Sequence, residues 1–210
     1  MSSKKSNAPK TAISPLMKTL ATYMAAAAKK PLPKAVAEKT KHHLLDTIAA
    51  MVSGSRLLPG EKAIAYAKTL GGKPQALVIG SDIVTNAEQA AHVNGMLAHA
   101  DETDDSHAPS LSHPGCAAVP AAMAMGEREK ASGTQLLRAV ALGYDLCARI
   151  NLSLHPYDFR QAGHSTHSFG PSFGAAAAAS LLAGLDYKGM RHALSYTAQQ
   201  ASGLSCWARD

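Results

Sequence analysis

The chain has 210 residues, of which 46% are hydrophobic and 17% charged, a composition that supports a packed core and excludes a disordered chain. Alanine supplies 41 residues and aromatic residues only 5%, which favours closely packed helices over a β-sandwich. The net charge of +6 arises at the N-terminus, because residues 1–41 carry +8 and the remainder carries −2. Without an accompanying aromatic and basic motif, this charge indicates a solvated tail rather than a nucleic-acid surface.

Helix signals alternate with breakers along the chain. Residues 1–12 are expected to form a basic disordered tail, and Ser14-Pro15 then supplies a helix cap and a proline at the first helical position. Gln75 to Ile79 gives the only clear strand signal. Helices are expected over residues 14–30, 33–54, 59–71, 86–99, 116–129, 132–152, 173–182 and 186–202. The sequence thus predicts an all-α bundle of about eight helices over residues 13–210, with at most one short strand pair.

Several sequence motifs are absent, and their absence disfavours the classes of protein and site that depend on them. The three cysteines are scattered and form no CxxC, so neither a disulfide framework nor a cysteine-based zinc site is expected. No apolar run is long enough for a membrane span, and the N-terminus lacks a signal-peptide core, so we expect a cytoplasmic protein without a membrane partner. Neither a Gly-rich phosphate loop nor a GxSxG nucleophile motif is present.

Two polar loops interrupt the apolar helices, and both concentrate histidine. They cover residues 99–115 and 162–170, and polar loops on a rigid scaffold are favoured places for binding and catalysis. A histidine beside a carboxylate has a tunable pKa that suits a general acid or base near neutral pH. The residues available to orient His107 or His113 in this way are Glu102, Asp104, Asp105 and Ser106.

Each feature also has a structural interpretation. The run Asp104 to Ser106 is equally compatible with a helix cap and turn, and His42 and His43 are expected to be solvent-facing or structural. His164 and His167 are compatible with capping residues. A metal site is a further interpretation, because many N and O ligands gather in the first loop: His99, Asp101, Asp104, Asp105, His107 and His113. No HExxH or EF-hand spacing accompanies them, so these residues give only a weak signal for a metal site.

The two loops together resemble the MmgE/PrpD family. The similarity rests on the run from His99 to His107, on His113-Pro114-Gly115, and on the later Gly163-His164-Ser-Thr. It extends over roughly residues 14–210 through other stretches, which include Leu45-Asp46, Gly71-Gly72, Val93-Asn94-Gly95, Gly143-Tyr144-Asp145 and Phe173-Gly174. The family includes 2-methylcitrate dehydratase, cis-aconitate decarboxylase and iminodisuccinate epimerase.

The resemblance implies a large helical domain, a smaller α/β lid domain, homodimerisation and chemistry without a cofactor. Its acidic loop motif maps onto Glu102, Asp104, Asp105 and Ser106, with Glu102 in place of the usual Asp and Ser106 in place of the usual Thr. Its two active-site histidines map onto His113 and His164. His107 lies in the same loop and is included as a substrate-binding or orienting residue.

These assignments imply lyase chemistry of the 2-methylcitrate dehydratase type on a small di- or tricarboxylate, with His113 and His164 transferring protons beside a carboxylate. Epimerase or decarboxylase activity of the same family is an alternative. The lid domain is absent from these residues, so the expected chain is a truncated helical domain whose missing half could reside on a separate chain. A non-catalytic helical fragment that only folds and dimerises is therefore the competing hypothesis.

Overall fold

The protein is described here by a computed structural model that places residues 12–206. These residues form nine α-helices and a single two-stranded antiparallel sheet, which confirms the predicted all-α class. The predicted tail lies, apart from Ala12, outside the described residues. The helices are α1 Pro15–Ala27, α2 Lys34–Gly54, α3 Leu58–Leu70, α4 Ala87–His99, α5 Gly115–Glu129, α6 Gly133–Ser153, α7 Pro156–Gln161, α8 Thr166–Leu182 and α9 Tyr187–Gln200.

Side-chain caps fix several helix starts where the sequence predicts them. The Ser14 hydroxyl accepts a hydrogen bond from the Met17 amide at 3.1 Å, and Pro15 begins α1. Ser132 and Gln135 form a reciprocal capping box at the start of α6. Asp186 caps α9 by accepting from the Gly189 amide at 2.8 Å. Each cap satisfies backbone donors that the first helical turn leaves without a partner.

The strand pair is small and is tied to α4. Its strands, β1 Ala76–Leu77 and β2 Val84–Thr85, pair with Ala76 opposite Thr85. Buried Asn94 of α4 accepts a hydrogen bond from the Ile79 amide and donates one to the Leu77 carbonyl, both at 2.9 Å. One side chain therefore replaces the partners that a wider sheet would provide.

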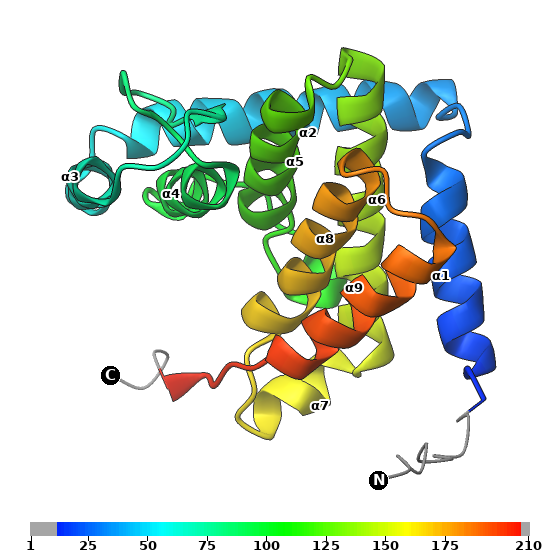
Figure 1. Cartoon of the computed structure of the whole chain (residues 1–210). Coiled ribbons are helices and arrows are strands. Elements are labelled where there is room, and N and C mark those ends of the chain that lie inside the picture. The colour runs from blue at the N-terminus through cyan, green and yellow to red at the C-terminus, as the bar shows by residue number, and fades with distance from the viewer. Residues whose placement is uncertain (1–11, 207–210) are drawn as a thin grey trace, which may run out of the picture.

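The centre of the fold is a close contact between α6 and α8. Figure 1 shows these helices beside α5, with α9 in front of them and α2 across the upper end. A β-carbon at Gly143 of α6 would lie 3.0 Å from the Gly174 carbonyl oxygen of α8, and one at Gly174 would lie 2.6 Å from the Gly143 carbonyl oxygen. Glycine at both positions lets the backbones meet, and small alanines fill much of the surrounding core.

The structure differs from the prediction between residues 155 and 171. The sequence predicts no helix in this polar, proline-containing stretch, but the structure has α7 and the first turns of α8 there. Pro156 occupies the start of α7, where its missing amide costs no helical hydrogen bond. Pro171 lies inside α8 and is buried, so packing against neighbouring helices outweighs the local tendency of proline to break a helix.

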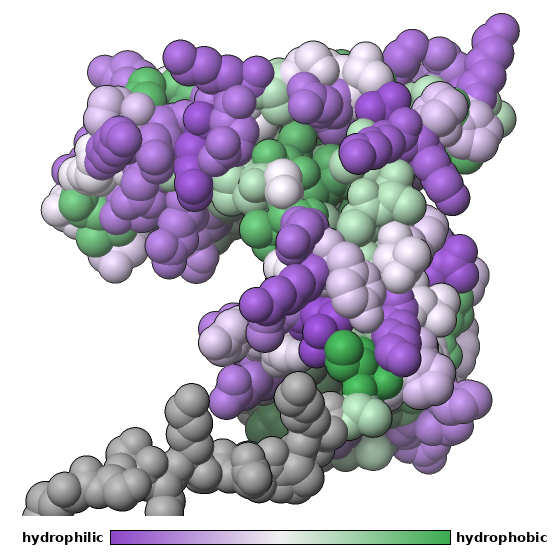
Figure 2. All heavy atoms as spheres, turned by 45° about the vertical axis from the view of Figure 1, so that its right-hand side comes forward, coloured by the Kyte–Doolittle hydropathy of each residue, from purple (hydrophilic) through white to green (hydrophobic). Residues whose placement is uncertain are grey.

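The molecular surface is deeply hollowed on one face. Figure 2 shows this hollow between an upper and a lower lobe, with hydrophobic surface along part of its inner wall. None of the helices between residues 12 and 206 combines the length and the apolar character needed to cross a membrane.

Candidate active site

The two polar loops are held together by Asn151 of α6. This fully buried side chain donates hydrogen bonds to the Ser110 carbonyl at 3.1 Å and the Thr166 carbonyl at 2.8 Å. It also accepts from the Gly170 amide at 2.8 Å. The first loop is therefore fixed against the start of α8, although the two segments lie far apart in the sequence.

The first loop has a defined backbone. Glu102 and Leu111 adopt the left-handed conformation, with φ angles of 59° and 48°. Such angles are uncommon for residues other than glycine and place sharp bends on either side of the acidic run. Between them, a short 3₁₀ helix spans Ala108–Ser110, and the His107 amide donates to the Ser112 carbonyl at 2.9 Å.

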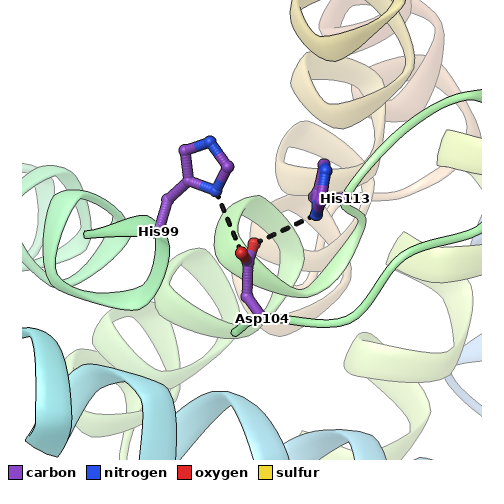
Figure 3. A group of neighbouring side chains, drawn as sticks. All are labelled: His99, Asp104 and His113. Atoms are coloured by element: carbon purple, nitrogen blue, oxygen red, sulfur yellow. Dashed lines mark hydrogen bonds and ion pairs between the residues drawn. The ribbon is translucent and has the colours of Figure 1, made fainter. Parts of the chain in front are cut away.

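Asp104 lies between two imidazoles. Its side chain is fully buried, and its Oδ1 is 3.0 Å from Nδ1 of His99. Its Oδ2 is 3.6 Å from Nδ1 of His113, a distance too long for a hydrogen bond. Figure 3 shows that His99, at the end of α4, and His113 lie on different sides of the Asp104 carboxylate. Catalytic hydrogen bonds are often long in the absence of substrate and shorten in its presence.

A third imidazole completes this cluster. The ring centroid of His113 is 5.2 Å from that of His99 and 5.1 Å from that of His167. The hydrogen bond to Asp104 raises the pKa of His99 above its usual value. Burial lowers the pKa of His167, and the neighbouring His113 and His99 lower it further. The pKa values of His99 and His167, whose rings flank His113, are thus shifted in opposite directions, and perturbed pKa values of this kind cluster at functional sites.

Asp105 points into a different network from its neighbour Asp104. Its Oδ2 is 2.9 Å from Nδ1 of His43 on α2, and its Oδ1 accepts from the Gly115 amide at 2.9 Å. A β-carbon at Gly115 would lie 2.6 Å from that Oδ1 and 2.7 Å from the Tyr144 hydroxyl. Position 115 therefore requires glycine, which explains the glycine that follows His113-Pro114.

A cavity of about 470 Å³ opens beside this second network. It lies between α2, α6 and the first loop, and the ring of His43 packs at 4.7 Å from the ring of Tyr144 in its wall. The predicted residues Asp105, Ser106 and His107 all line it. Pockets of this size commonly hold small-molecule ligands.

The remaining predicted residues lie in different environments. Glu102 is exposed, with Oε1 3.7 Å from Nε2 of His99. Nδ1 of His107 is 2.7 Å from the Ser110 hydroxyl. His164 is exposed and stacks on Phe159 with a centroid separation of 4.7 Å, while the ring from the second loop that contacts His113 belongs to His167.

Sequence reasoning did not select several residues that the structure brings to these networks. They are His43, His99, Tyr144, Asn151 and His167. His99 and His167 could have been selected from the sequence, because both lie within the two polar, histidine-rich loops. His43, Tyr144 and Asn151 lie in helices with ordinary amphipathic patterns, so only the tertiary packing reveals them.

One group within residues 12–206 has a donor set suited to a metal ion. His99, Asp104 and His113 each bring a ligand atom within 4.8 Å of the others. Two imidazoles and a carboxylate are ligands that first-row transition metals accept. Nucleophilic sulfur is disfavoured, because burial raises the pKa values of the Cys116 and Cys147 thiols and keeps both protonated near neutral pH.

Comparison with known proteins gives concordant results. Residues 18–210 match the family model described as the MmgE/PrpD N-terminal domain. The chain is 31% identical over 183 residues to a cis-aconitate decarboxylase-like protein, oryM, of Aspergillus oryzae, a match covering 82% of this chain and 37% of that protein. It is 29% identical over 179 residues to cis-aconitate decarboxylase of Aspergillus terreus, covering 82% and 36% respectively. The chain therefore spans little more than a third of these relatives.

Proposed function

The chain belongs to the MmgE/PrpD family through its N-terminal domain, and from this premise we propose that it carries part of a lyase site for a small di- or tricarboxylate. The observation that carries the proposal is the arrangement of His99 and His113 around the buried Asp104 carboxylate. In the proposed reaction His113 transfers a proton at the carbon beside a substrate carboxylate. His164 is the proposed second proton-transfer group.

Asp104 supports such a role for His113 by its position. When the 3.6 Å contact shortens to a hydrogen bond in the substrate complex, the carboxylate facing Nδ1 selects the tautomer with its proton on that atom, which leaves Nε2 to exchange a proton with substrate. The same carboxylate stabilises the imidazolium that forms when His113 accepts a proton. Positioned general acids and bases contribute about 10²–10⁴-fold to rate.

Two lyase reactions place similar demands on this site. In dehydration, a base removes a proton from carbon, the electron pair of that C–H bond forms the C=C bond, and an acid protonates the hydroxyl group so that it leaves as water. In decarboxylation, the C–C bond to a carboxylate breaks, carbon dioxide leaves, and an acid protonates the carbon that retains the electron pair. The names of the relatives favour decarboxylation of cis-aconitate as the first reaction to test. Dehydration of 2-methylcitrate and epimerisation within the same family follow as alternatives.

The test is an assay of the purified chain with cis-aconitate, 2-methylcitrate and citrate, following carbon dioxide release and the change in unsaturation. We expect His113→Asn and Asp104→Asn to lower kcat/KM by at least about tenfold, because the acid–base group or its orienting charge is lost. His92→Asn, an exposed change on α4, is the control and should leave turnover unchanged. A well-folded chain without turnover on any substrate would favour the non-catalytic alternative.

The proposal also covers the substrate, the oligomeric state and the cofactors of the protein. We propose a small carboxylate substrate, a homodimer, no metal and no organic cofactor. Because the relatives are much longer, a second chain supplying further substrate contacts belongs to the same proposal. Activity that survives EDTA is expected. Activity lost with EDTA and restored by zinc would instead assign a metal to His99, Asp104 and His113.

A further inference from the structure

The cluster around Asp104 brings three metal-ligand atoms together from separate parts of the chain. His99 ends α4, Asp104 lies in the first loop, and His113 precedes α5. Their ligand atoms all lie within 4.8 Å of one another. The Asp104 oxygens are 3.0 Å from Nδ1 of His99 and 3.6 Å from Nδ1 of His113. Ligand atoms held tetrahedrally around zinc are roughly 3.4 Å apart, so these two separations are close to those of a formed site.

The donor set favours a transition metal over calcium or magnesium. Imidazole nitrogens suit zinc and its neighbours in the first row, whereas calcium and magnesium prefer a shell of oxygen ligands. The carboxylate of Asp104 is fully buried, and Figure 3 shows one imidazole on either side of it. Buried charges in proteins are paired or coordinate metals, so a dication between the two rings suits this carboxylate.

The cluster is accessible and has a further carboxylate beside it. The side chains of His99 and His113 are 41% and 20% exposed, so an ion from solvent can reach the carboxylate between them. Nε2 of His99, the nitrogen that faces away from Asp104, lies 3.7 Å from Oε1 of Glu102. A carboxylate at the outer nitrogen of a ligating histidine is common at metal sites, where it orients the ring.

We infer that His99, Asp104 and His113 bind a zinc ion that inhibits the protein. A zinc ion on Nδ1 of His113 leaves the proton of the neutral ring on Nε2. Both ring nitrogens are then occupied, so the ring can neither accept a proton from substrate nor form the imidazolium that returns one. This inhibition rests on the proposed function, whereas the binding rests on the ligand geometry alone. Turnover does not require the ion.

The first experiment measures metal binding to the untagged chain, by calorimetry with zinc and by the visible spectrum of bound cobalt(II). We expect one ion per chain and a cobalt spectrum of nitrogen and oxygen ligands without a thiolate band. His99→Gln and Asp104→Asn should each lower zinc affinity about a hundredfold or more, because losing a group that only orients a ligand already costs about 10–100-fold. The ring of His99 is partly exposed, so His99→Gln should fold even if the buried Asp104→Asn does not.

Matched variants control for binding elsewhere on the chain. His92→Gln changes an exposed histidine on the same helix as His99, and Asp82→Asn changes an exposed aspartate outside the cluster. Cys206→Ser removes an exposed thiol that could itself attract zinc. All three variants should bind zinc with the affinity of the wild-type chain.

The second experiment tests inhibition with a substrate that the chain turns over. Zinc should inhibit over the same concentration range in which it binds, and EDTA should restore the activity. His92→Gln should be inhibited as the wild-type chain is. His99→Gln, compared with its own activity in EDTA, should require about a hundredfold more zinc, in proportion to its lost affinity.

The outcomes separate this inference from the proposed function. Unchanged zinc affinity in both His99→Gln and Asp104→Asn would overturn the site, as would affinity that is lost in Cys206→Ser. Zinc bound at the cluster without effect on turnover, or turnover that requires zinc, would overturn the inhibitory role. Turnover without zinc binding would support the proposed function while rejecting the site. Zinc binding with the expected variant pattern in a chain without turnover would support the site while the proposed function fails.

Discussion

Asp104 and Asp105 are adjacent residues that serve different networks. The buried Asp104 lies between His99 and His113, while Asp105 joins α2 to the start of α5 through His43 and Gly115. Composition alone identified both as polar loop residues near histidines. It could not assign a histidine to each, because His99, His113 and His43 lie in different elements that only the tertiary fold brings to the loop.

The histidines around Asp104 predict an opposing dependence of stability on pH. Asp104 raises the pKa of His99 above 6.5, so its contribution to stability is full below about pH 6.5 and is lost as pH rises through the folded-state value. The pKa of His167 is lowered, so protonation opposes folding and stability falls as pH drops below 6.5.

Chemical denaturation at pH 5.5 and pH 8 separates the two contributions. Relative to wild type, His99→Gln should lose more stability at pH 5.5 than at pH 8, whereas His167→Gln should lose less at pH 5.5. Each pH-dependent difference is expected to stay below about 1 kcal/mol, because His99 is well exposed to screening solvent and His167 is only partly buried. The same sign for both variants would contradict the assigned charge states.

At the scale of elements, local sequence predicted most helices and long-range packing decided the rest. The starts of α1, α6 and α9 were predictable because their caps lie within three residues of the groups they satisfy. The early start of α8 was not, because its first turn is secured by Asn151 of α6 rather than by a side-chain cap of its own. His43 was missed for the same reason, since its partner Asp105 lies in a distant loop.

The contact between α6 and α8 predicts a strong effect of adding one methyl group. Gly143→Ala places a β-carbon 2.8 Å from the Ala118 β-carbon and 3.0 Å from the Gly174 carbonyl oxygen. Because helix backbones cannot yield as a flexible side chain can, we expect a loss of about 1–3 kcal/mol in the free energy of unfolding. Denaturant titration measures it.

Gly133→Ala on the same helix is the matched control. A β-carbon there meets nothing within 4 Å, and alanine should be neutral or stabilising by up to about 1 kcal/mol. Equal stability of the two alanine variants would show that α6 and α8 can separate without cost. The positions of the second loop and of His167 would then depend less on this contact than the structure indicates.

At the scale of the whole molecule, the composition of the sequence predicted two features well: the close packing of the helices and the position of the polar loops. High alanine content predicted close helix packing, and the polar loops on the helical scaffold are where the structure gathers its imidazoles. The surface was less predictable, because apolar residues on amphipathic helices are normally assigned to a core. On α2, Leu45, Ala49 and Val52 are instead exposed along one side of the helix.

This exposed side of α2 leads to a prediction about association. Exposed apolar patches promote contact between copies, and we expect the chain to form a concentration-dependent dimer in light scattering and sedimentation. Leu45→Glu with Val52→Glu should weaken the dimer by about tenfold or more, because a buried interface would then carry unpaired charges. Leu16→Glu is the control, since Leu16 and Leu45 are both 69% exposed but lie on different helices. A monomer at every concentration would reject the dimer, and equal weakening by the control would assign association to general hydrophobicity rather than to α2.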